Sequence, residues 1–207
     1  TAAATTVYAG DLEGNVWRVD ITSDDPTAWT VTVLFQATDA GGARQPITTV
    51  PVVSLNMDFP RLPGVMVYVG TGQMLGIPDL SSTQVQTMYG VYDSGTNPST
   101  LKRGDLEGQS MSALGTTLRV ISGGPIALPT DKGWYVDLSL LSGERIVTDP
   151  RIDSGAVIAT TVQPSSDTCN GGDVAWLMEF NYAGGTFITP QFDTNGNNTL
   201  DSGDTTD

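Results

Sequence analysis

The chain has 207 residues, of which 39% are hydrophobic and 15% charged, with 24 Gly, 12 Pro and a formal net charge of −14. This balance favours a turn-rich all-β globular protein over a disordered one, and the acidic charge disfavours nucleic acid as a partner. Because the sequence contains no histidine, Ser-His-Asp triads and histidine-ligated zinc are excluded. No apolar run approaches the roughly 20 residues that a membrane-spanning helix needs.

Residues Val7 to Asp20 predict two short strands joined by a tight turn. Gly14 and Asn15 supply the residue types that tolerate positive φ in such a turn. A strand, a turn and a second strand carrying Trp17 are typical of the start of a propeller blade. Asp11 is interpreted as a residue that caps the turn.

Further β runs bounded by glycine follow along the chain. Between Ser94 and Lys132 the pattern weakens, and Leu118–Ile121 is the only clear β fragment there. The apolar run Ser154–Val162 predicts a buried central strand. The prolines of Pro46–Leu55 place that strand near an edge, or mark the start of a strand. The other expected strands are Trp29–Phe35, Val65–Gly72, Thr87–Asp93, Gly133–Leu138, Glu144–Thr148 and Ala175–Asn181, with a turn at Tyr182–Thr186 that leads into Phe187 and Ile188.

These elements predict an all-β, β-propeller-like fold built from antiparallel four-stranded blades. We expect a partial propeller of about three to four blades over residues 1–192, with a long insertion near 94–132, and a separate C-terminal end at 193–207. A large β-sandwich produces a similar pattern and is the alternative. Open blade edges favour pairing with another chain.

The C-terminal end carries the strongest chemical signal. Oxygen-bearing side chains occupy positions 1, 3, 5, 9 and 12 of a twelve-residue loop, and position 7 offers its backbone carbonyl, as Ca²⁺ requires. Asn198 replaces the usual glycine and the last ligand is Asp instead of Glu, so weak, extracellular-range binding is expected. A solvated Asn/Asp/Gly-rich tail is the alternative. The candidate ligands are Asp193, Asn195, Asn197, Thr199, Asp201 and Asp204.

Three other features are interpreted structurally. Arg103-Gly104-Asp105 is an integrin-type tripeptide, but it is also ordinary turn chemistry, and Gly104–Gly108 repeats the sequence of Gly10–Gly14. Cys169 is the single cysteine, so it forms no disulfide within these residues and is interpreted as an unpaired thiol or the partner of a cysteine elsewhere. The start at Thr1 carries no signal peptide and is interpreted as a cut edge.

Catalysis has little support in the sequence. Lys102 and Lys132 have no motif partner. The carboxylates of Asp137, Glu144 and Asp149 are interpreted as parts of turns at strand ends and not as an acid–base pair. We therefore expect a protein that is not an enzyme.

An ordered series of segments resembles the PilY/PilC-type proteins of type IV pili, which are tip adhesins and biogenesis factors with a C-terminal β-propeller. The series covers nearly the whole chain and ends in the acidic loop at Asp193. Its members are Ala9–Asp20, Pro46–Val53, Val67–Gly72, Met88–Asp93, Gly133–Leu138, Gly143–Thr148 and Ala175–Glu179.

The resemblance implies a surface-exposed protein at the pilus tip, associated with the outer membrane and exported through the periplasm. It implies partners among pilins and minor pilins, host or surface receptors, and calcium that regulates biogenesis, retraction and adhesion. Three departures matter. Residues Thr1–Thr6 lack the carboxylates of the family's upstream calcium loop, Arg103–Asp105 stands where the family has a different Arg-x-Asp-Leu sequence, and family members are far longer, with an N-terminal adhesive domain.

Two alternatives remain open. The Gly-Asp-Leu-x-Gly-x-x-Trp pattern that starts at Gly10 is similar to the docking repeats of quinoprotein dehydrogenases, but the adjacent cysteine pair and the full set of repeats are missing. The terminal loop also resembles a dockerin, a partner-binding module that normally presents two such loops flanked by helices.

Overall fold

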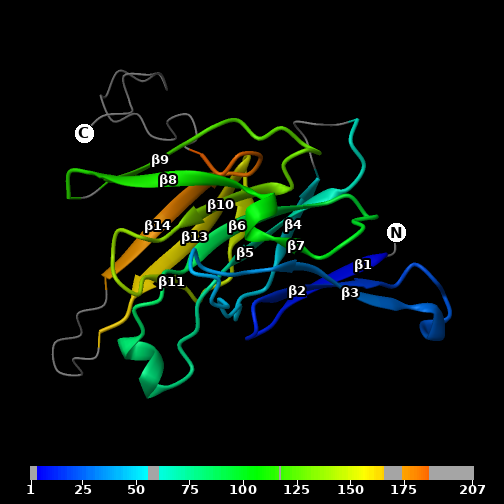
Figure 1. Cartoon of the computed structure of the whole chain (residues 1–207), viewed down its shortest axis with the longest axis horizontal. Helices are drawn as coiled ribbons and strands as arrows, with labels where there is room; N and C mark the ends of the chain where they lie inside the picture. Colours follow the sequence, from blue (N-terminus) through cyan, green and yellow to red (C-terminus); the bar gives the residue numbers. More distant parts are fainter. Residues whose placement is uncertain (1–3, 56–60, 117, 166–173, 187–207) are drawn as a thin grey trace.

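A computed structural model of the chain describes residues 4–55, 61–116, 118–165 and 174–186. Within these ranges the chain is all-β, as predicted, and its helical segments are three short 3₁₀ turns (Figure 1). No helix of the described residues is long and apolar enough to cross a membrane. The 3₁₀ turns are η1 (Pro26–Ala28), η2 (Ile77–Ser81) and η3 (Arg103–Asp105).

The first sheet contains the predicted opening hairpin. Its order is β1-β2-β3-β7, and the first three strands are antiparallel while β7 runs parallel to β3. Gly14 closes the hairpin turn with a φ of +75°, a conformation that glycine adopts without strain. The strands are β1 (Thr6–Gly10), β2 (Asn15–Asp20), β3 (Thr30–Gln36) and β7 (Leu101–Lys102).

The second sheet contains an antiparallel four-stranded unit of the kind predicted, in the order β4-β5-β6-β10. On the far side of β10 the sheet is extended by β8, which runs parallel to it, and by β9. The edge position of β4 confirms the prediction from the prolines. The strands are β4 (Val52–Leu55), β5 (Val65–Gly70), β6 (Thr87–Asp93), β8 (Glu107–Leu114), β9 (Leu118–Ser122) and β10 (Gly133–Asp137).

The third sheet is built around β13, which confirms the predicted central strand. β14 pairs with β13 along the whole length of β13. β11 and β12 pair with the two halves of β13, so they lie on the edge of β13 that is opposite to β14. The strands are β11 (Arg145–Ile146), β12 (Arg151–Asp153), β13 (Ala156–Gln163) and β14 (Val174–Asn181).

The stretch 94–132 differs from the prediction. Leu118–Ile121 is not its only β segment, because β7 and β8 lie there as well. The sequence of β8, Glu-Gly-Gln-Ser-Met-Ser-Ala-Leu, is poor in β-branched and aromatic residues, so its propensity gave no signal. It forms a strand because the edge of β10 accepts it. This stretch therefore contributes β7 to the first sheet and β8 and β9 to the second.

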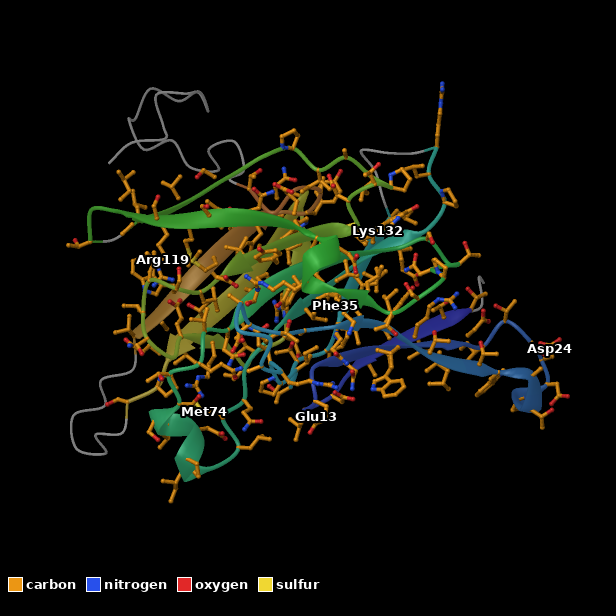
Figure 2. All side chains as sticks on the ribbon, in the orientation of Figure 1. Glu13, Asp24, Phe35, Met74, Arg119 and Lys132 are labelled. Atoms are coloured by element: carbon orange, nitrogen blue, oxygen red, sulfur yellow. The ribbon has the colours of Figure 1, made fainter. Side chains whose placement is uncertain are left out.

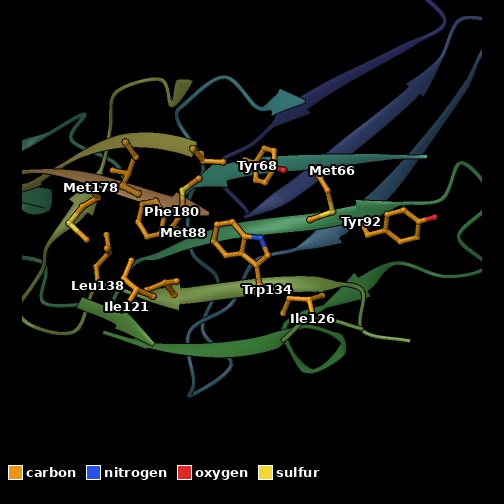
Figure 3. Close-up of a cluster of buried hydrophobic side chains, with 14 residues drawn as sticks. Met66, Tyr68, Met88, Tyr92, Ile121, Ile126, Trp134, Leu138, Met178 and Phe180 are labelled. Atoms are coloured by element: carbon orange, nitrogen blue, oxygen red, sulfur yellow. The ribbon is translucent and has the colours of Figure 1, made fainter. Parts of the chain in front are cut away.

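The second sheet is covered on both faces. Along β5, Met66 and Tyr68 face a cluster shared with the third sheet, while Val67 and Val69 face a cluster shared with the first. This alternation follows from the two-residue period of a strand. In the first of these clusters Trp134 lies among methionine and aromatic side chains (Figure 3).

Two glycines make room for Trp134. A Cβ atom on Gly90, its neighbour across the strand pair, would lie 2.5 Å from the indole ring. One on Gly185 would lie 2.4 Å from a different atom of the same ring system. The large side chain is therefore accommodated by bare backbone, which explains why glycines stand inside or beside these strands.

Candidate functional site

The predicted calcium ligands lie outside the described residues, as do Cys169, Phe187 and Ile188. Within the described ranges, no group of three or more Asp, Glu or Cys side chains is arranged to hold a metal ion. The calcium site therefore stays a prediction from the spacing of Asp193, Asn195, Asn197, Thr199, Asp201 and Asp204.

Asp11 organises the first turn, as predicted. Its carboxylate accepts hydrogen bonds from the backbone N–H and side-chain amide of Asn15, both at 2.9 Å, and from the indole N–H of Trp17 at 2.7 Å. Burial opposes ionisation, but these donors outweigh it, so the pKa of Asp11 lies below its usual range. Its carboxylate is occupied by the hairpin itself.

The Arg-Gly-Asp tripeptide is part of the fold. The guanidinium of Arg103 donates two hydrogen bonds to Asp137, at 2.6 and 3.0 Å, and lies 3.8 Å from the ring centroid of Tyr135. Only 13% of the Arg103 side chain is exposed. The carboxylate of Asp105 accepts a hydrogen bond from the backbone N–H of Lys102. Both charged side chains of the tripeptide are bonded within the fold, which confirms its structural interpretation.

A buried polar network lies next to Arg103, between the first two sheets. Tyr89 donates a 2.6 Å hydrogen bond to the side-chain carbonyl of Gln45, whose amide donates to Thr87. Burial raises the pKa of Tyr89 to about 12, so it stays a donor at neutral pH. Each of these side chains is buried and bonded, which indicates a structural seam and not a reactive centre.

The other carboxylates considered for catalysis also have structural partners. Glu144 is fully buried and forms an ion pair of 2.5 Å with Arg119. Asp149 accepts a hydrogen bond from the backbone N–H of Val50, and Asp137 holds Arg103. No two of the three form an acid–base pair in the described residues.

A cleft of about 480 Å³ is lined by residues of β2, β3 and β6 and by residues 95–100. At its base the Nε of Arg18 lies 3.0 Å from the carboxylate of Asp93, which also accepts a 2.6 Å hydrogen bond from Tyr8. Burial, and then the contact with Asp93, raises the pKa of Tyr8. The cleft walls are Thr32–Leu34 of β3 and residues 95–100.

Sequence reasoning missed this cleft. Asp93 ends β6 and Arg18 lies in the middle of β2, so they meet only when the first two sheets pack together. The sequence offered only a weak indication of it. Tyr8 and Arg18 are direct partners across the opening hairpin, and a cation that becomes buried beside a tyrosine needs a counter-charge.

Residues 2–121 match the family described as the PilY1 beta-propeller domain, which is more than half of the chain. The chain belongs to the PilY1 β-propeller family. This membership confirms the resemblance to PilY/PilC-type pilus proteins and the propeller fold.

Named relatives agree with the PilY1 assignment. Two type IV pilus biogenesis factor PilY1 homologues of Xylella fastidiosa are 30% and 34% identical and cover 86% and 91% of this chain. The type IV pilus biogenesis factor PilY1 of Pseudomonas aeruginosa PAO1 is 28% identical over 94% of the chain. These relatives are named as biogenesis factors and not as enzymes.

A solved structure also agrees with the PilY1 fold. The crystal structure of the Pseudomonas aeruginosa PilY1 C-terminal domain aligns with 94% of this chain, at 28% identity and a TM-score of 0.76. The alignment covers 47% of that domain, and the chain spans 13–20% of the three relatives. The chain thus corresponds to part of the relatives it matches.

Proposed function

We propose that the chain is a calcium-binding portion of the β-propeller of a surface-exposed type IV pilus protein. Its role is in pilus biogenesis, in control of retraction and in adhesion, with pilins or minor pilins as partners. The observation that carries this proposal is the family match over residues 2–121, supported by relatives named as pilus biogenesis factors.

The proposed calcium site is the terminal loop. The oxygen ligands at Asp193, Asn195, Asn197, Thr199, Asp201 and Asp204 have the spacing that a seven-coordinate calcium loop requires. The described residues provide no competing cluster of acidic side chains. Since the loop contains two asparagines among its ligands, we expect a dissociation constant on the order of 10⁻⁴–10⁻³ M.

Calorimetric titration of the chain with CaCl₂ tests the site. We expect one binding event that disappears in Asp193→Ala and in Asp201→Ala. Asp24→Ala is the matched control, because it removes one exposed carboxylate at the far end of the first sheet (Figure 2). Heats that are the same in the wild type, Asp193→Ala and Asp201→Ala would remove calcium from the proposal.

The pilus role is tested in bacteria that carry the full-length protein. We expect deletion of the propeller to reduce the number of surface pili. We expect the loop variants to remove the dependence of that number on calcium. Surface pilus counts that do not depend on the propeller would contradict the proposed role.

A further inference from the structure

One edge of the first sheet is only partly used. β3 pairs with β2 along its length, but on its other side β7 pairs only at Phe35 and Gln36. From Thr30 to Leu34 this outer edge carries no strand in the described part of the chain. Backbone groups at such an edge are able to pair with another chain.

The hydrogen-bond pattern of the first hairpin shows which groups of β2 face β3. At one end of the hairpin Asp11 donates its N–H to the carbonyl of Asn15, and at the other Ile21 donates to Thr5. Hydrogen-bonded pairs alternate with non-bonded pairs along an antiparallel ladder. The odd-numbered residues of β2 therefore bond to β1, and the even-numbered ones bond to β3.

The same alternation fixes the direction of the backbone of β3. Arg18 is even-numbered and pairs with Thr32, so Thr32 uses its N–H and C=O toward β2. Val31 and Val33, which flank Thr32, then direct their N–H and C=O groups away from β2. These four groups have no hydrogen-bond partner in the described residues, which leaves a short ladder ready for one more strand.

The cleft of about 480 Å³ borders this open edge, because Thr32, Val33 and Leu34 line it. Its walls include Thr32, Val33 and Leu34 on one side and residues 95–100 on the other. The ionisable side chains in its lining are Arg18 and Asp93, which form an ion pair and cancel in charge. An uncharged segment thus fits the cleft without leaving a charge unpaired.

We propose that the cleft accepts an uncharged, extended peptide segment of a partner protein, which adds to β3 as a strand in line with β7. This is recognition by β-strand addition, in which main-chain hydrogen bonds supply the affinity. The edge from Thr30 to Leu34 accommodates about five residues, or roughly 16 Å of strand. The net charge of −14 opposes a second copy of the chain as the occupant.

The proposal is tested with the ¹⁵N-labelled chain and blocked five-residue peptides that alternate threonine with valine, leucine or isoleucine. We expect the amide signals of Val31 and Val33 to shift and their hydrogen exchange to slow when a peptide binds. Val33→Pro removes one outward N–H and leaves the β2 ladder intact, so it should weaken binding at least tenfold. Val33→Ala, which keeps that N–H, should bind like the wild type, and circular dichroism verifies that both variants fold.

Three outcomes would overturn the proposal. One is that none of these peptides perturbs Val31 or Val33. Another is that Val33→Pro, while folded, binds as tightly as the wild type. The third is that the chain forms a dimer in sedimentation experiments and Val33→Pro makes it a monomer, since the edge would then belong to a second copy. None of these outcomes depends on calcium, so they are distinguishable from failure of the proposed function.

Discussion

The segments Gly10–Gly14 and Gly104–Gly108 have the same five residues, Gly-Asp-Leu-Glu-Gly, and different structures. The first is the turn between β1 and β2, and Gly14 at its end takes a φ of +75°. The second leaves η3 and enters β8 as extended strand. Leu12 is 52% exposed, whereas Leu106 is 8% exposed.

The difference shows that neighbours outside the five residues decide the structure. The carboxylate of Asp11 accepts hydrogen bonds from Asn15 and Trp17, which follow it in the sequence and which the tight hairpin brings close to it. Asp105 turns back to the N–H of Lys102, and the strand that follows is held by β10. Tertiary pairing therefore overrides identical local sequence.

The largest expected difference between the two segments is in the effect of substituting Leu106 and Leu12. We expect Leu106→Ala to lower the free energy of unfolding by about 2–4 kcal/mol, because Leu106 packs in the cluster between the first two sheets. Leu12→Ala should change it by less than about 0.5 kcal/mol, since that side chain is largely in solvent. Urea unfolding measures both, and equal effects would contradict the contrast.

Substitution of Asp11 and of Asp105 should give a smaller difference in the free energy of unfolding. Asp11→Ala should cost about 1–3 kcal/mol, because it removes an ionised acceptor of three hydrogen bonds. Asp105→Ala should cost less than about 1 kcal/mol, since one exposed bond is lost. Urea unfolding at pH 7 gives the two values.

The effect of Asp11→Ala on the free energy of unfolding should depend on pH. The folded-state pKa of Asp11 is lowered, so its contribution is present at neutral pH and is lost as the pH falls through that folded-state pKa. We expect the difference between wild type and Asp11→Ala in unfolding free energy to shrink from pH 7 towards pH 2. A difference that stays constant over this range would contradict the role of the ionised carboxylate.

The smallest expected effect is at the Arg-Gly-Asp tripeptide. Asp105→Glu changes the acidic residue of the tripeptide, in which Arg103 is held by Asp137 and Tyr135. We therefore expect integrin-bearing cells to attach equally to surfaces coated with the wild type and with Asp105→Glu. Reduced attachment to the variant would show that the tripeptide opens for recognition.

The sequence predicted those strands that are rich in apolar and β-branched residues. Val65–Gly72 and Ser154–Val162 were found because their apolar residues face packed sheets, and the role of Asp11 followed from turn chemistry. β7 and β8 were missed because their strand state comes from β3 and β10, which are distant in sequence. The cleft at Arg18 and Asp93 was missed for the same reason, as its walls come from different sheets.

The path of residues 101–109 has a mechanical consequence. Within this short stretch the chain pairs first with β3 and then, from Glu107 to Gln109, with β10. A force that separates the first sheet from the second must break one of these two pairings, because one continuous segment is bonded to each sheet. The two sheets should resist tension as one unit, with the rate of forced unfolding set by rupture of this cross-connection.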